Sequence, residues 1–335
     1  MDTNSTTHAT VVVVTYNHAD FIETCLRSSL AENPAKVIVV DTGSTDGTKD
    51  IVSEKFPDVE LFTMAENRGY GAGNNVGVSS IDTEFTVILN PDTRVESGCF
   101  EALLEPLAEM KNRITTPKIL TYDGKHINTC GNIDHFTGLG FTRGFYRPPM
   151  ELSETERLSG LSGACFALRT ELYREIGGFD EELFLYMEDV ELSWRAALND
   201  IEIRYIPDAI ICHDYEDIQV PAKKIYHLER GRYYILRKYL NMKTTMMLLP
   251  SLLLTELLTT GFAVLSGTEG IRNKLRGMRE GLTMDINTVK KDPQTVLSKL
   301  AVKIPEDQLT YSMLDLFGKK FANTVYKLNY SLLNV

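Results

Sequence analysis

A carboxylate directly follows an apolar run at Asn90-Pro91-Asp92. Residues 85–89, which precede it, are rich in the Val, Ile and Leu side chains that favour a buried strand. Pro91 cannot donate to a strand ladder, so we expect the chain to leave the sheet there and to present Asp92 at the strand's carboxyl end. Open α/β sheets bind ligands at this edge, and a carboxylate there can hold a divalent metal against a phosphate. A solvated Asp in an Asn-Pro-Asp turn is the alternative.

A second pair of acids, Glu188 and Asp189, comes much later in the chain, after Gly177-Gly178, which are expected to end a preceding helix. Both acids fall where a new helix is predicted to begin. Acidic residues are favoured in a first turn on electrostatic grounds alone, so a structural role is one interpretation. The other is a general base, which a helix start would hold rigidly. The residues expected to face the core from this helix are Val190, Trp194 and Leu198.

Secondary structure must position these side chains, and in the first half of the chain segments with strand patterns alternate with segments with helix patterns. Strands are expected at residues 10–15, 36–40, 59–63 and 85–89. Such repetition implies a mostly parallel sheet with right-handed crossovers. Three strand ends then bring Thr15-Tyr16-Asn17, Asp41 and Asp92 to one edge, which outlines a cleft of nucleotide size.

A glycine-rich loop at residues 67–77 looks like a phosphate cradle, but it contains neither G-x-G-x-x-G nor G-x-x-x-x-G-K-[ST]. The turn after the first strand, Tyr16-Asn17-His18, has no glycine. A dinucleotide-binding fold needs glycines at that turn, where the backbone meets the pyrophosphate. The sequence therefore disfavours a nicotinamide-dependent enzyme.

Composition narrows the class of protein further. The chain has 335 residues, of which 43% are hydrophobic, enough for one large domain or two modest ones. Its formal net charge of -11 argues against a nucleic-acid binder that uses its whole surface. The five cysteines are scattered without a C-x-x-C pair, which predicts neither a disulfide framework nor a zinc site and fits a reducing compartment. We expect no signal peptide before the first strand.

The order of five motifs resembles the family 2 glycosyltransferases, which are inverting enzymes of the GT-A fold with nucleotide-sugar donors. The motifs are residues 14–17, 41–48, 66–70, 90–92 and 188–189. Residues 67–70 and 184–195 look most like the rhamnosyltransferase-like branch. The resemblance implies an α/β fold with a Rossmann-like, mostly parallel central sheet and flanking helices. It places the catalytic domain at residues 8–240 and leaves 241–335 as a C-terminal helical region.

Carried over residue by residue, the resemblance also implies roles. Donor binding falls to Thr15, Tyr16, Asn17, Asp41, Ser44, Asn67, Arg68, Gly69, Asn75, Asn90 and Asp92. Asp92 matches the final acid of the family's Asp-x-Asp signature, whereas Asn90 replaces the first, so one carboxylate remains for the metal. Mg²⁺ or Mn²⁺ held mostly by diphosphate oxygens and water would suit such a site, with Asp92 and His213 as protein ligands. A plain surface histidine is the alternative for His213, and Arg68 and Arg195 are diphosphate contacts or partners of local acids.

Inversion is a single displacement in which the acceptor hydroxyl attacks opposite the leaving nucleoside diphosphate. A hydroxyl is a poor nucleophile at neutral pH, so a carboxylate must take its proton. We assign that role to Asp189, with Glu188 orienting Asp189 or the acceptor. The reaction expected is transfer of rhamnose or another hexose from a nucleoside-diphosphate donor to a saccharide or polyprenyl-linked acceptor. A nucleotidyltransferase and a non-catalytic sugar-nucleotide-binding protein are the alternatives.

The C-terminal third points to a membrane. Residues 221–243 hold seven Lys and Arg against one acid, with tyrosines between them, which suits an anionic lipid surface; a solvated helix face is the alternative. Residues 244–266, charged only at Glu256, are long enough to span a membrane, although an interfacial segment or a buried hairpin is favoured. Residues 290–335 are expected to form helices that cap the domain or make a homodimer contact. We therefore expect a cytoplasmic protein, peripheral on the inner face of the cell membrane.

Overall fold

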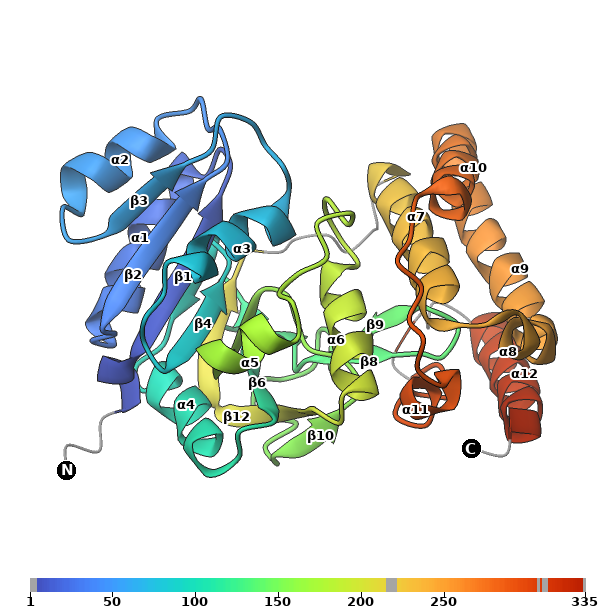
Figure 1. Ribbon diagram of the computed structural model, residues 1–335. Helices are drawn as coiled ribbons and strands as arrows, with labels where there is room; N and C mark the ends of the chain where they lie inside the picture. The colour runs from blue at the N-terminus through green and yellow to red at the C-terminus, as the bar shows by residue number, and fades with distance from the viewer. Residues whose placement is uncertain (1–4, 215–221, 306–307, 309–312, 334–335) are drawn as a thin grey trace.

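The computed structural model describes residues 5–214, 222–305, 308 and 313–333, with side chains from 317 onward in the last of these ranges. A ten-stranded sheet lies at its centre, with helices on both faces (Figure 1). One half of the sheet is parallel, in the order β4-β1-β2-β3. Its strands are β1 (Ala9–Thr15), β2 (Lys36–Asp41), β3 (Glu60–Thr63) and β4 (Phe85–Leu89). All four confirm the strands expected from the sequence, and the register pairs Thr15 with Asp41.

The other half of the sheet mixes strand directions. Strand β11 (Cys165–Arg169) runs antiparallel beside β4 and is followed in order by β6 (Arg113–Thr121), β12 (Glu202–His213) and β10 (Glu156–Leu158). Two short strands branch off: β5 (Thr93–Val95) pairs with β12, and β7 (Ile127–Thr129) pairs with β6. A separate two-stranded sheet holds β8 (Asn132–Asp134) and β9 (Gly140–Thr142). Because β11 is antiparallel to β4, its amino end meets the carboxyl end of β4 at one sheet edge.

Helices cover the sheet because the parallel strands are apolar on both faces. Val11 and Val13 of β1 pack into one core cluster, whereas Val12 and Val14 pack into another on the opposite face. The flanking helices are α1 (Ala19–Ala31), α2 (Thr48–Lys55), α3 (Tyr70–Ser79), α4 (Cys99–Glu109), α5 (Thr170–Glu175) and α6 (Glu188–Leu198), with a short 3-10 helix, η1, at Ser5–His8. The fold is thus the mixed α/β, mostly parallel architecture that the sequence predicts.

The glycine-rich segment differs from the expected loop, because most of it forms helix α3. Its glycines allow the helix to lie very close to the sheet. A Cβ at Gly73 would lie 2.6 Å from a methyl carbon of Val14, and one at Gly77 would lie 2.5 Å from a methyl carbon of Val12. Such separations are far below contact distance, so the glycines serve helix–sheet packing.

Helices follow the sheet in the C-terminal part of the chain and lie to the right of α6 in Figure 1. They are α7 (Ala222–Tyr239), α8 (Met242–Met247), α9 (Leu249–Leu265), α10 (Gly267–Thr283), α11 (Pro293–Leu297) and α12 (Met313–Tyr330), with a 3-10 helix, η2, at Ser331–Leu333. Helices α7 and α10 approach at Gly277 and Gly281, where a Cβ would lie 2.4 Å from a carbonyl oxygen of α7. Across the described residues, we find no helix with the length and apolar character needed to cross a membrane.

The cations and tyrosines of α7 were expected to face a lipid surface, and for several of them this is wrong. Arg232 is 2% exposed and pairs with Glu229 at 2.7 Å and with Glu256 at 2.6 Å. Lys238 pairs with Asp180 at 2.5 Å and with Glu191 at 2.7 Å. Charges buried in this way must be paired, so α7 uses them to hold α6 and α9 rather than to meet solvent or lipid.

Candidate active site

The carboxyl ends of β1 and β2 are tied together by a turn network. Asp41 is fully buried, and its Oδ1 accepts the backbone N–H groups of Gly43 at 3.0 Å and Ser44 at 2.9 Å. Ser44 Oγ accepts the N–H of Asn17 at 2.8 Å, and Asn17 Oδ1 accepts the N–H of Thr45 at 2.8 Å. Asp41 Oδ2 has no hydrogen-bond partner among the described residues, so this oxygen can accept a hydrogen bond from a ligand.

The residues between β1 and α1 extend this edge. Thr15 is buried, and its Oγ1 lies 3.3 Å from Nδ1 of His18, whereas Tyr16 is 45% exposed. Burial lowers the pKa of His18, opposed by the negative charges of Asp92 and Asp46. The charge of Asp92, which follows β4, thus acts on His18 in the turn after β1.

The loop before α3 contacts the loop before α6. Gly69 has φ +92°, and a Cβ there would lie 2.1 Å from the carbonyl oxygen of Phe184, so only glycine fits. The same oxygen accepts the N–H of Tyr70 at 3.1 Å. Asn67 Oδ1 accepts the N–H of Gly69 at 2.9 Å, and Arg68 forms an exposed ion pair with Glu181 at 2.6 Å.

Asn75 was expected to bind the donor, but its side chain is fully used elsewhere. Its Oδ1 accepts the Tyr173 hydroxyl at 2.7 Å and the N–H of Phe179 at 2.9 Å. Its Nδ2 donates to the carbonyl of Phe179 at 3.0 Å and to Glu181 at 3.1 Å. An amide offers four hydrogen bonds, so none remains for a ligand, and the structure gives Asn75 a role in fixing α3.

Asp92 and His213 come together, as the sequence reading expected. His213 ends β12, and its Nε2 lies 3.3 Å from Asp92 Oδ1 and 3.4 Å from Nδ2 of Asn90. Its Nδ1 lies 3.3 Å from Oδ1 of Asn128, which fixes the ring. Burial works against the Asp92 carboxylate, but the hydrogen bond and charge of His213 lower the pKa of Asp92 below its ordinary value.

The cluster of Asp92 and His213 could offer a divalent cation only part of its ligands. Asp92 Oδ1 is buried and lies 3.3 Å from Nε2 of His213, so both side chains could contact one cation. Within the described part of the chain, no three His, Cys, Asp or Glu side chains gather closely enough to hold a metal on their own. A hard cation could therefore take one or two protein ligands here, with diphosphate oxygens and water supplying the others.

Asp189 is the second residue of α6 and accepts hydrogen bonds from three N–H donors. Its Oδ2 accepts from Asn132 Nδ2 at 3.1 Å and from the backbone of Gly163 at 3.3 Å, and its Oδ1 accepts the N–H of Val190 at 2.8 Å. Burial raises the pKa of both Asp189 and Glu188, and the charge of Asp189 raises that of Glu188 further. The pair is a rigid, desolvated carboxylate site.

One short segment connects the two acid sites. The carbonyl of Ala164 accepts the N–H of Asn90 at 2.9 Å, and the adjacent Gly163 donates to Asp189. Asp189 and the Asn90–Asp92 turn therefore flank the same segment, where β4 ends and β11 begins. Gly163 leaves little room there, because a Cβ would lie 3.3 Å from Cβ of Asp189.

Sequence reasoning missed Asn128, Asn132 and Gly163, which support the acids from β7, β8 and the segment before β11. No motif marks them, because each acts from a short irregular strand or turn. It also left open the role of Arg195, which pairs with Glu191 and donates to the carbonyl of Gly178 at 2.7 Å. That arginine is structural, and Trp194 is fully buried, as expected.

Comparison with known proteins identifies the family to which the chain belongs. Residues 10–177, half of the chain, match the family described as Glycosyl transferase family 2. An N-acetylglucosaminyl-diphospho-decaprenol L-rhamnosyltransferase of Mycobacterium tuberculosis (strain ATCC 25618 / H37Rv) is 30% identical over 229 residues, which cover 61% of this chain and 75% of the relative.

Two solved structures show the same fold. GalNAc-T7 with UDP, GalNAc and Mn²⁺ aligns with TM-score 0.60 and 15% identity over 81% of this chain and 53% of the other. Residues 1–349 of TarS from S. aureus, in complex with UDP, align with TM-score 0.54 and 19% identity over 97% and 91%. At these identities the likeness concerns the fold alone.

Proposed function

The chain belongs to glycosyl transferase family 2, and we propose that it transfers a hexose, with rhamnose the first candidate, from a nucleoside-diphosphate donor to an acceptor hydroxyl with inversion. Family membership makes the chain a glycosyltransferase, so the nucleotidyltransferase alternative is wrong. Rhamnose is favoured because the 30% identical relative is named for rhamnosyl transfer. The observation that carries the proposal is the carboxylate of Asp189, held on the same segment as the Asn90–Asp92 turn.

Asp189 is the proposed general base. Its three N–H donors fix the carboxylate, and burial makes it a stronger base than a solvated Asp. It takes the proton of the acceptor hydroxyl as the oxygen forms its bond to the anomeric carbon and the bond to the diphosphate breaks. Glu188, whose pKa is raised by burial and by Asp189, is proposed to keep its proton and to orient the acceptor.

The donor is proposed to lie along the β1–β2–β4 edge. Asp41 has a buried acceptor for a ribose hydroxyl or a base N–H, and the Asn17–Ser44 network shapes the turn around it. Asp92 and His213 would hold Mg²⁺ or Mn²⁺, which neutralises charge on the leaving diphosphate when it is bound. A neighbour solved with UDP and Mn²⁺ supports a divalent ion without selecting one.

The acceptor is proposed to be a saccharide on a polyprenyl diphosphate, met at the inner face of the membrane. The relative named for a decaprenol-linked substrate supports the lipid carrier. An apolar stripe supports the membrane surface: its residues recur at helical spacing along α8 and α9 and are between 48% and 72% exposed. They are Met242, Met246, Leu249, Leu253 and Leu257.

Helix α9 is turned with its polar side inward. Ser251 Oγ donates to Asn329 Oδ1 at 2.6 Å, and Thr255 Oγ1 lies 2.8 Å from the Tyr326 hydroxyl, both inside the protein. Leu249, Leu253 and Leu257 are thereby left facing outward, which suits a helix lying at a lipid boundary. The alternative is that a second copy of the chain packs on this face. Sedimentation of the protein without lipid tests this alternative by measuring its oligomeric state.

The transfer is tested by incubating the protein with Mn²⁺, a panel of nucleoside-diphosphate sugars and a polyprenyl-linked acceptor. We expect one donor to release nucleoside diphosphate in step with acceptor glycosylation, and NMR of the product to show inverted anomeric configuration. Binding of a donor without acceptor-dependent release would favour the non-catalytic alternative. A product that keeps the donor's configuration would refute the single displacement.

The apolar stripe is tested separately by vesicle sedimentation. Leu253→Gln with Leu257→Gln should release the protein from anionic vesicles. Met110→Gln with Met150→Gln, which changes two exposed apolar residues elsewhere, should not. Equal binding of the two double variants would remove α9 from the membrane contact.

A further inference from the structure

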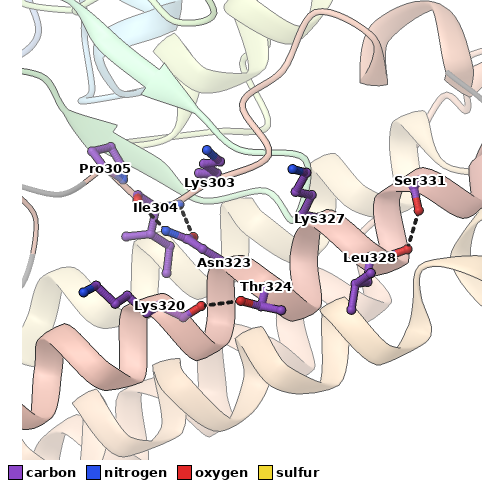
Figure 2. Close-up of a pocket in the computed structure, with 9 residues that line it drawn as sticks. All are labelled: Lys303, Ile304, Pro305, Lys320, Asn323, Thr324, Lys327, Leu328 and Ser331. Carbon is purple, nitrogen blue, oxygen red and sulfur yellow. Dashed lines mark hydrogen bonds between the residues drawn. The ribbon is translucent and has the colours of Figure 1, made fainter.

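A hollow of about 780 Å³ opens between the segment 303–305 and helix α12. Among the residues that line it are Lys303 of the segment and Lys320 and Lys327 of α12 (Figure 2). The two walls are joined at Asn323, whose Oδ1 accepts the N–H of Ile304 at 2.7 Å and whose Nδ2 donates to its carbonyl at 3.1 Å. The hollow is therefore built into the packing of α12.

The three lysines that line the hollow form no ion pair with any described residue. Other lysines of this region behave differently: Lys274 pairs with Glu229 at 2.9 Å, and Lys238 with Asp180. Three ammonium groups that have no acidic partner among the described residues line one concave surface, where they repel one another and raise the local positive potential. An anion in the hollow would relieve that repulsion.

Exposed aromatic and aliphatic side chains adjoin the lysines on α12. Phe317, Phe321 and Leu328 are each 65% exposed, and their spacing of four and seven residues places them along one helix face. Lys320 and Lys327 belong to the flank of that face. A helix surface with apolar residues beside lysines suits the boundary between lipid headgroups and acyl chains.

Charge is divided unevenly along the chain. Residues 222–335 hold eighteen Lys and Arg against nine Asp and Glu, a formal net charge of +9, whereas residues 1–221 carry -20. The region that contains the hollow is thus the cationic part of an acidic protein. Such a division favours an anionic surface as the partner of this region.

We propose that the hollow binds the phosphate of an anionic phospholipid headgroup, with Phe317 and Phe321 entering the acyl boundary beside it. The inference deepens the proposed membrane association and rests on it. The apolar stripe of α8 and α9 would contribute uncharged contact area with the lipid, and the three lysines would make the protein prefer an anionic leaflet. Binding at the hollow would hold the protein on the surface where a lipid-linked acceptor is found.

The test measures binding of the full chain to phosphatidylcholine vesicles with and without phosphatidylglycerol. Each Lys near an anionic surface contributes about 1 kcal/mol, so Lys303→Gln, Lys320→Gln and Lys327→Gln together should weaken binding to the mixed vesicles about a hundredfold. A matched triple, Lys49→Gln, Lys111→Gln and Lys290→Gln, removes the same charge from lysines outside the hollow. It should stay within about threefold of the natural protein, because charges beyond a Debye length of the lipid are screened.

Equal binding by the two triple variants would overturn the headgroup site while leaving the membrane association in place. Absence of vesicle binding by the natural protein would overturn both. Millimolar inorganic phosphate should not displace the protein from mixed vesicles; displacement only in the natural protein would make the hollow a site for free phosphate. Release of nucleoside diphosphate with a water-soluble acceptor should be unchanged in both triple variants. This assay therefore tests the proposed glycosyl transfer separately from the headgroup site.

Discussion

Asn132 is the residue whose substitution tests most clearly how hydrogen bonds control the pKa of Asp189, the proposed general base. Its Nδ2 donates to Asp189 Oδ2 at 3.1 Å and to the carbonyl of Leu161 at 2.9 Å. The variant Asn132→Ala removes one of three donors to the carboxylate and leaves those of Gly163 and Val190. Because the lost bond favours the charged form, the pKa of Asp189 should rise further.

The size of the rise follows from hydrogen-bond energies. A hydrogen bond to a charged group contributes about 1.5–3 kcal/mol, and one pKa unit corresponds to about 1.4 kcal/mol. The pKa of Asp189 should therefore rise by about one to two units. A base must be deprotonated to act, so the acidic limb of the rate profile should move to higher pH by the same amount. Activity at pH values below the limb should fall about tenfold or more and recover on the alkaline side.

The assay is the pH dependence of kcat/KM for nucleoside diphosphate release with acceptor present. Asn199→Ala is the matched control, because Asn199 caps the other end of α6 and donates to the carbonyl of Arg195 at 2.8 Å. It should leave the limb in place. An Asn132→Ala profile that is uniformly lower but not displaced would show that Asn132 does not tune Asp189, and the reasoning would fail.

Three further predictions concern the donor edge, a loop contact and a buried acid. Asp92→Asn should weaken nucleoside diphosphate binding in Mn²⁺ and flatten its metal dependence; calorimetry that finds both unchanged would remove Asp92 from the metal site. Gly69→Ala should lower the free energy of unfolding far more than Gly98→Ala, because both have positive φ but only Gly69 meets the Phe184 carbonyl, and equal thermal shifts would refute this. Burial raises the pKa of Asp134, so the native state keeps a proton that the unfolded chain releases above about pH 4, and stability falls as pH rises. Asp134→Asn should therefore stabilise more at pH 8 than at pH 5 in thermal melts.

The carboxyl ends of the parallel strands could be predicted from the sequence, because an apolar run that stops at turn residues is compatible with few structures other than a buried strand followed by a turn. Asp41 and Asp92 follow such runs, and both lie at the predicted edge. His213 was also placed well, since it ends the apolar strand that returns beside β5. These positions depend on local pattern and on the rules of parallel sheets.

Contacts between distant segments could not be read in the same way. Asn75 lies in a glycine-rich stretch that resembles a phosphate loop, but its partners are more than ninety residues away at Tyr173 and Phe179. Asn132 supports Asp189 from a three-residue strand that carries no periodic signal. The cations of α7 looked like a solvent or lipid face because their acidic partners, among them Asp180 and Glu256, lie on other elements. Pairing partners are a property of the packing.

The variant Asp189→Asn tests the central claim most directly. Donor affinity and metal dependence should stay near those of the natural protein, because the donor is proposed to bind along the β1–β2–β4 edge. Transfer should fall by about 10²–10⁴-fold, the usual loss when a general base is removed. Near-normal turnover by this variant, or a loss of donor binding as large as the loss of rate, would contradict the assignment of proton removal to Asp189.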